Sequence, residues 1–168
     1  FMMVERFGMD VQQLTTLYLI NLILNIGLAP LLGRAVARYG ERNALVLEYF
    51  GLALVFFAYG GIYLFGWGIL IAASLYILDH LFFGLALAIK TYFQKIADPQ
   101  DIAATAAVAF TINHIAAIFL PVSLGFLWLV SPFLVFCTAG TLAIFSFVLA
   151  LLIPREPRIG KETIFCVS

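Results

Sequence analysis

The feature that most constrains this chain is the absence of charged side chains from two long stretches. No Asp, Glu, Lys or Arg occurs in residues 49–78 or in residues 102–154. Each stretch exceeds the ~20 apolar residues that cross the hydrocarbon core of a bilayer once. Apolar residues make up 64% of the chain, against roughly 45–50% in a soluble domain, so a soluble fold of this size cannot bury them all. The sequence therefore predicts a polytopic membrane protein.

Glycine, proline and charged residues divide the chain into five apolar segments that are each long enough to span a bilayer. We predict spans at residues 14–32, 44–62, 68–89, 103–128 and 133–153. Only helices or closed barrels satisfy their backbone polar groups in lipid, and these segments lack the apolar–polar alternation of barrel strands. The expected fold is an all-α bundle of five transmembrane helices. Residues 1–13 are expected to be the external end of a preceding helix, and residues 154–168 a tail.

The distribution of basic residues predicts the orientation. Eight of the nine Lys and Arg residues lie in the 33–43 loop, the 90–101 loop and the 154–168 tail. Short loops rich in Lys and Arg stay on the cytoplasmic side, so these three segments are expected to be cytoplasmic and the N-terminal end external, in a plasma (inner) membrane. The nine acidic residues balance the nine basic ones, which excludes a basic nucleic-acid-binding protein.

The first basic loop contains a spaced pattern of glycine and arginine: Gly33, Arg38, Gly40 and Arg42, followed by Leu45. These five positions fit a loop signature that the segment resembles, that of the major facilitator superfamily, Gly-x-x-x-Asp-Arg-x-Gly-Arg-Arg with a later Leu. Ala37 replaces the Asp, and Glu41 occupies a basic position. The resemblance implies that the chain forms helices eight to twelve of a twelve-helix transporter, whose N-terminal half is a missing partner. Apart from this resemblance, Arg38 and Arg42 can reach anionic lipid headgroups or the carbonyls at the C-terminal end of a neighbouring helix. The alternative is a plain basic loop that only follows the positive-inside rule.

Polar side chains near the centres of three spans are the candidate site residues, because ionisable groups inside a membrane are costly. Asn25, Asp79 and His114 each lie roughly 16 Å inside a predicted span, close to the midplane. Each has a polar neighbour on its own helix: Asn21, His80 and Asn113. We expect Asp79 and His114 to lie within hydrogen-bond or one-water reach and to line a solute or proton pathway. Interhelical hydrogen bonds that only hold the helices together are the alternative.

The spans without polar residues at their centres are expected to have supporting roles. The second and fifth spans have no Asp, Glu, His, Asn or Gln near their centres, so we expect them to be the most lipid-exposed in the assembled protein. Glu48 lies near the end of the second span and is expected to extend to the interface. Pro121 should kink the fourth span, as a gate hinge or as a static bend.

Together these patterns predict transport of a small solute by alternating access, coupled to an ion such as the proton. The alternative is a non-transporting membrane scaffold or a truncated remnant of a transporter. An intramembrane enzyme that uses Asp79 and His114 as acid and base would need a positioned nucleophile or metal set, so no enzymatic activity is expected. No metal site is expected, because the two histidines have no cysteine near them. No cofactor is expected either.

Overall fold

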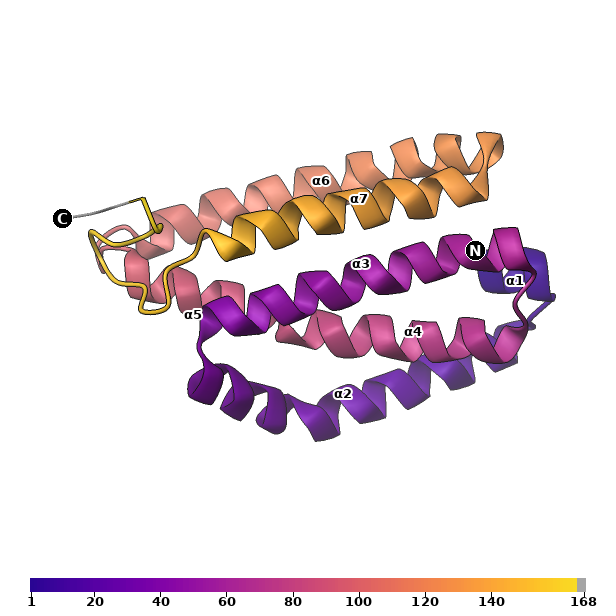
Figure 1. Ribbon diagram of the computed structural model, residues 1–168, viewed down its shortest axis with the longest axis horizontal. Helices are drawn as coiled ribbons and strands as arrows, with labels where there is room; N and C mark the ends of the chain where they lie inside the picture. The colour runs from indigo at the N-terminus through magenta and orange to yellow at the C-terminus, as the bar shows by residue number, and fades with distance from the viewer. Residues whose placement is uncertain (166–168) are drawn as a thin grey trace.

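The computed structural model describes residues 1–165, and this part of the chain is helical without an extended strand (Figure 1). The elements in order are α1 (Met2–Phe7), α2 (Val11–Tyr39), α3 (Glu41–Phe65), α4 (Ile69–Phe83), the 3-10 turn η1 (Gly84–Ala86), α5 (Leu87–Ile96), α6 (Ile102–Val130) and α7 (Pro132–Leu151). Five spans in the described residues are long and apolar enough to cross a membrane: α2, α3, the run from α4 through α5, α6 and α7. The predicted all-α fold with five transmembrane helices is confirmed.

The helices run further than the predicted spans at the end of the bundle that carries residues 33–43, 87–102 and 151–165, which we call the basic end. Residues 33–39 continue α2 as helix, and the chain turns into α3 only at Gly40. The φ of Gly40 is 83°, a backbone conformation that favours glycine. Hydropathy marks where a helix leaves the lipid, and it does not mark where the helix ends. The 90–101 segment also lies outside the predicted spans, and its first part is helical because α5 continues to Ile96.

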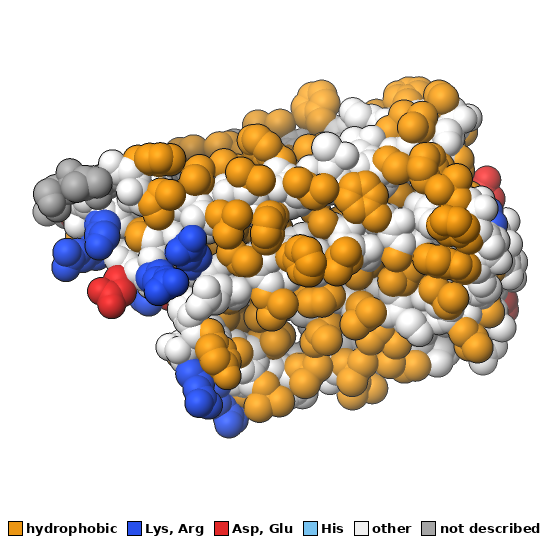
Figure 2. Space-filling model, viewed as in Figure 1, with side chains coloured by type: hydrophobic (Ala, Val, Ile, Leu, Met, Phe, Trp, Pro, Cys, Tyr) orange, Lys and Arg blue, Asp and Glu red, His pale blue; other side chains and the backbone are white. Residues whose placement is uncertain are grey.

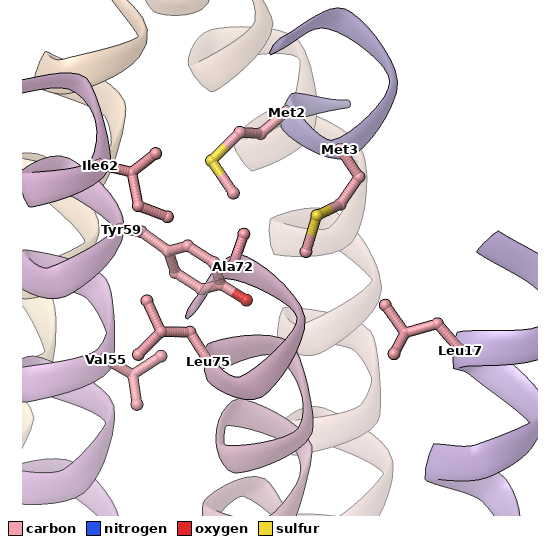
Figure 3. Close-up of a cluster of buried hydrophobic side chains, with 8 residues drawn as sticks. All are labelled: Met2, Met3, Leu17, Val55, Tyr59, Ile62, Ala72 and Leu75. Carbon is pink, nitrogen blue, oxygen red and sulfur yellow. The ribbon is translucent and has the colours of Figure 1, made fainter. Parts of the chain in front are cut away.

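The first thirteen residues form a short separate helix, a turn and the start of α2. α1 ends at Gly8, whose φ is 62°. α2 then begins with a capping box, in which the Asp10 side chain accepts from a backbone N–H and the Gln13 side chain accepts from the Asp10 N–H. Met2 and Met3 of α1 are buried in a cluster with residues of α2, α3 and α4 (Figure 3). α1 therefore covers one end of the bundle, which we call the α1 end.

The centre of the bundle is α3, which makes its largest contact with α7 and lies against α4 on another side (Figure 1). Glycines allow these helices to approach closely. At Gly140 of α7 an added Cβ would lie 2.9 Å from the Phe57 ring, and at Gly51 of α3 it would lie 2.5 Å from the Phe82 ring. Small residues at helix contacts are typical of membrane proteins, because packing rather than hydrophobic burial drives helix association in lipid.

The burial of α3 differs from the expectation that the second and fifth spans are the most lipid-exposed. Within the described chain α3 is the most buried span, whereas no residue of α6 is buried. The large exposed side chains in the middle of α3 are Leu47, Phe50, Leu54 and Phe57; their spacing places them along one side of the helix. Within this five-helix chain α3 is not the most exposed span, because hydropathy does not separate a helix side that faces lipid from one that faces another helix. For the assembled protein the expectation stays a prediction.

Filling the space at Gly51 should destabilise the bundle. We expect Gly51→Leu to lower the free energy of unfolding by about 1–3 kcal/mol, since the side chain has no room beside the Phe82 ring. The matched control is Gly27→Leu, because Gly27 lies in α2 with no atom within 4 Å of its added Cβ. Denaturant titration of the detergent-solubilised chain by circular dichroism measures both. Equal stability of the two variants would contradict close packing at Gly51.

Candidate functional site: a polar interface between α2 and α4

Two polar side chains from different helices converge on one backbone carbonyl within the membrane-spanning part of the chain. Asn21 of α2 is only 2% exposed, and its Nδ2 donates to the Tyr76 carbonyl of α4 at 3.4 Å. The Nδ1 of His80 lies 3.0 Å from the same carbonyl. A carbonyl oxygen has two lone pairs, and one of them serves the helical N–H, so Asn21 and His80 share the other. The Tyr76 carbonyl thus links α2 to the polar side of α4.

Asn25 extends this interface by one helical turn. Its Nδ2 donates to the Asn21 carbonyl at 2.9 Å. Both asparagines line a cavity of about 30 Å³ whose other walls are apolar side chains of α2 and α4; a space of this size holds about one water molecule. The Oδ1 of Asn25 lies 3.5 Å from the position of an added Cβ at Gly84. Gly84, which begins η1, therefore lets α2 and the Asn25 side-chain amide approach the third span closely.

Asp79 and His80 form the ionisable part of the interface. Oδ2 of Asp79 lies 3.5 Å from Nδ1 of His80, and the two side chains are 26% and 33% exposed respectively. The His80 ring lies against the Tyr76 ring with centroids 4.4 Å apart. A carboxylate beside an imidazole can bind and release protons at membrane depth. Four of the six candidate site residues named from the sequence thus lie on α2 and α4: Asn21, Asn25, Asp79 and His80.

Asn113 and His114 lie elsewhere, on α6. His114 is exposed, its Nδ1 lies 2.9 Å from the Phe110 carbonyl, and its ring centroid lies 3.9 Å from that of Phe110. α6 packs against α7, and Figure 1 shows α7 and α3 between α6 and α4. Among residues 1–165, no hydrogen bond or ion pair joins Asp79 to His114. The structure does not bring these two residues together, because equal depth in the membrane does not decide which helices are neighbours.

The glycine and arginine pattern of the first basic loop lies at the junction of α2 and α3. Arg42 donates from its guanidinium to the Leu151 carbonyl at 3.1 Å, at the C-terminal end of α7. This contact confirms the expectation that an arginine here reaches the carbonyls of a neighbouring helix. The Arg38 guanidinium lies 5.6 Å from the Tyr39 ring centroid. Gly33 lies inside α2 with no atom within 4 Å of its added Cβ.

Sequence reasoning missed an ion pair at the same junction. Nζ of Lys95 lies 2.7 Å from Oε1 of Glu41, which joins the start of α3 to the end of α5. Glu41 is only 3% exposed. The available signal was its position, because it directly follows the Gly40 turn and an acidic side chain is stabilised in the first turn of a helix.

Glu48 is the second residue whose role was missed. It was expected to extend to the interface, but it is only 2% exposed, and its Oε2 has no hydrogen-bond partner among the described residues. That expectation is wrong, because Glu48 lies on the side of α3 that carries the buried residues Ala44, Leu45 and Leu52. A buried carboxylate without a partner is costly, so Glu48 joins Asp79 as a candidate functional residue.

The α1 end of the bundle is closed by contacts between α1 and the ends of α3 and α6. Nε1 of Trp128 donates to Oε2 of Glu5 at 2.7 Å. Arg6 donates to the Ile62 carbonyl at 2.9 Å, and its guanidinium lies 4.6 Å from the Tyr63 ring centroid. α6 continues as helix through Pro121, whose role as a hinge stays a prediction.

Comparison of the chain with family models, with curated proteins and with solved structures found no match. The resemblance to the major facilitator superfamily therefore stays a prediction that rests on the loop pattern and the order of spans. Within residues 1–165, no group of three or more His, Cys, Asp or Glu residues is placed to hold a metal ion.

Removing Lys95 from the Glu41–Lys95 pair should lower the free energy of unfolding more than removing Glu41. We expect Lys95→Gln to lower the free energy of unfolding by about 1–3 kcal/mol, because the buried Glu41 carboxylate then loses its partner. Glu41→Gln should cost less, and the double variant no more than Lys95→Gln alone. Chemical denaturation in detergent measures the double-mutant cycle. The control is Lys90→Gln at an exposed position. If Lys95→Gln lowered the free energy of unfolding no more than this control, the ion pair would not stabilise the fold.

Proposed function

We propose that the chain is part of a membrane transporter that moves a small solute by alternating access, with an ion gradient, specifically a proton gradient, as the energy source. The observation that carries this proposal is the convergence of amide, carboxylate and imidazole side chains at the α2–α4 interface. Secondary transporters hold their substrates and coupling ions near the bilayer midplane, where helices are interrupted. The 3-10 turn η1 interrupts the third span four residues after His80, and such turns inside helices are typical of hinges.

The difference between the two ends of the bundle supports this proposal. The α1 end is covered by α1 through the contacts of Glu5 and Arg6. No short helix of this kind lies at the basic end among residues 1–165. Alternating access requires that the two ends open in turn, so an asymmetric bundle is the arrangement expected of one state of the cycle. We place the basic end in the cytoplasm of a plasma (inner) membrane, following the positive-inside rule.

The exposed polar side chains of α6 support a larger assembly. Asn113 and His114 are exposed in the middle of the least buried span. Polar groups at this depth face a bundle interior or a water-filled cavity rather than lipid. The partner we propose is the N-terminal half of the same transporter, which would enclose the solute pathway together with α2, α4 and α6. In this role the protein carries out no covalent chemistry and needs no cofactor.

A non-transporting scaffold is the second candidate, and the exposed polar side chains of α6 favour it. A scaffold would use Asn113 and His114 to hold a partner helix by hydrogen bonds. Asp79 and His80 would then only support the contact between α2 and α4. The two functions differ in whether the titration of Asp79 matters, because a scaffold needs the shape of this side chain and a transporter needs its proton.

The proton-coupling role predicts the behaviour of Asp79→Asn in the full-length protein that contains this chain. The substitution keeps the shape and most hydrogen bonding but removes the titration. We expect solute-driven proton flux to fall at least tenfold, while downhill solute uptake persists. Proteoliposomes loaded with a pH-sensitive dye and exposed to a panel of sugars, amino acids and organic ions measure the proton flux, and labelled solutes from the panel measure uptake.

The matched control is Asp98→Asn, because Asp98 is exposed after the end of α5. Unchanged proton flux in the Asp79 variant would exclude this residue as the coupling group. If no solute of the panel moves in the unmodified protein, the scaffold is favoured. Asp79→Leu tests whether Asp79 has only a structural role. A scaffold would tolerate Asp79→Asn but would fold in lower yield with Asp79→Leu.

A further inference from the structure

A cavity of about 370 Å³ opens at the basic end of the bundle. Its walls come from α3, α5, α7 and the segment that follows α7, and they include Tyr49, Ile89, Ser146 and Thr163. Pockets that hold small molecules have volumes of about 300–1,000 Å³, so this cavity is large enough for a ligand. It shares no lining residue with the cavity at the α2–α4 interface.

The segment after α7 forms one wall of the cavity because it folds back against the helices. The Ile164 N–H donates to the Leu152 carbonyl at 2.9 Å. The Tyr92 hydroxyl of α5 donates to the Glu162 carbonyl at 2.6 Å. These two bonds hold residues 152–164 beside the ends of α5 and α7. The cavity is thus a built feature of the fold rather than a gap between two helices.

The chemistry of the lining suits an amphiphile. Most of the lining side chains are apolar, among them Leu45, Ile89 and Leu149. Tyr49 and Ser146 add two hydroxyl groups that have no hydrogen bond to any residue of the described chain 1–165. Ser146 lies roughly 10 Å inside the predicted fifth span, which ends at residue 153, and Tyr49 lies roughly 8 Å inside the predicted second span, which begins at residue 44, at ~1.5 Å per residue. The hydroxyls therefore lie at the depth where a lipid changes from its polar head to its acyl chains.

The net charge of the basic end favours an anionic ligand, because its three segments carry eight Lys and Arg residues against five Asp and Glu residues. Figure 2 shows Lys and Arg side chains gathered at this end, with an acidic side chain among them. Lys90 directly follows the lining residue Ile89, and Arg155 lies two residues after the lining residue Ile153. Both basic side chains are exposed. Clusters of Lys and Arg beside membrane spans attract anionic lipid headgroups.

We propose that this cavity binds an anionic phospholipid, with one acyl chain between α3, α5 and α7 and the phosphate beside Lys90 and Arg155. The hydroxyls of Tyr49 and Ser146 donate hydrogen bonds to the ester oxygens. Apolar side chains alone accept any acyl chain, so the basic residues provide the selection for a negative headgroup. The site is independent of the proposed transport, because it requires only that the chain lies in a membrane.

Native mass spectrometry of the detergent-purified protein tests the proposal with phosphatidylglycerol and phosphatidylcholine as the two probes. We expect at least a fivefold preference for phosphatidylglycerol at equal lipid concentration. Ser146→Phe fills the cavity and should reduce the bound phosphatidylglycerol at least fivefold, whereas Val148→Phe on an exposed part of α7 should leave it unchanged. The Lys90→Gln, Arg155→Gln double variant should bind both lipids equally. Its control is Arg34→Gln, at an exposed position of α2.

A second measurement keeps the proposal testable if the cavity-filling variant does not fold. Phosphatidylglycerol with a photoreactive diazirine on its acyl chain is crosslinked to the unmodified protein, and the labelled peptides are mapped. We expect labels near Tyr49, Ile89 and Ser146. Labels confined to the exposed surface of α6, equal binding of the two lipids, or equal binding by the Ser146 and Val148 variants would overturn the proposal.

Discussion

The close contact of α3 with its neighbours is the interaction on which the rest of the structure depends. Lipid gives helices no hydrophobic reason to associate, so close packing at small residues must hold the bundle together. Gly51 accommodates the Phe82 ring, and Gly140 accommodates the Phe57 ring. These contacts fix α4 and α7 on different sides of α3. Once they are in place, α2 lies against α3 and α4, and α6 lies against α7.

Polar side chains then complete the bundle by binding the backbone of other helices. Asn21 binds the Tyr76 carbonyl, and Arg42 binds the last carbonyl of α7. Arg6 binds the Ile62 carbonyl near the end of α3. The Leu151 carbonyl lies in the last turn of α7, where carbonyls lack an intrahelical partner and are natural acceptors for such donors. The Ile62 carbonyl accepts from Arg6 in addition to the Gly66 N–H. The candidate site differs, because its acceptor lies within α4 and its donors lie at membrane depth.

The candidate site could be predicted in part. The cost of polar groups in lipid is enough to select Asn21, Asn25, Asp79 and His80 from the sequence, and the structure places all four on the neighbouring helices α2 and α4. The same argument selected His114, but depth along a helix gives no information on which helix lies beside it. Glu48 was misjudged for a related reason, since its distance from the end of a span says nothing about the side of α3 on which it lies.

The sequence by itself determined that the chain is a bundle of membrane-spanning helices, because the length of the charge-free segments and the cost of unpaired backbone groups in lipid leave no other fold. It also determined which end of the bundle is basic. Only the tertiary structure decided that α3 is central, that Glu41 meets Lys95 and that Glu48 is buried. These outcomes depend on the rotation of each helix about its axis and on its neighbours. Nearly uniform hydropathy around a membrane helix does not specify either of them, because lipid and protein interiors are similarly apolar.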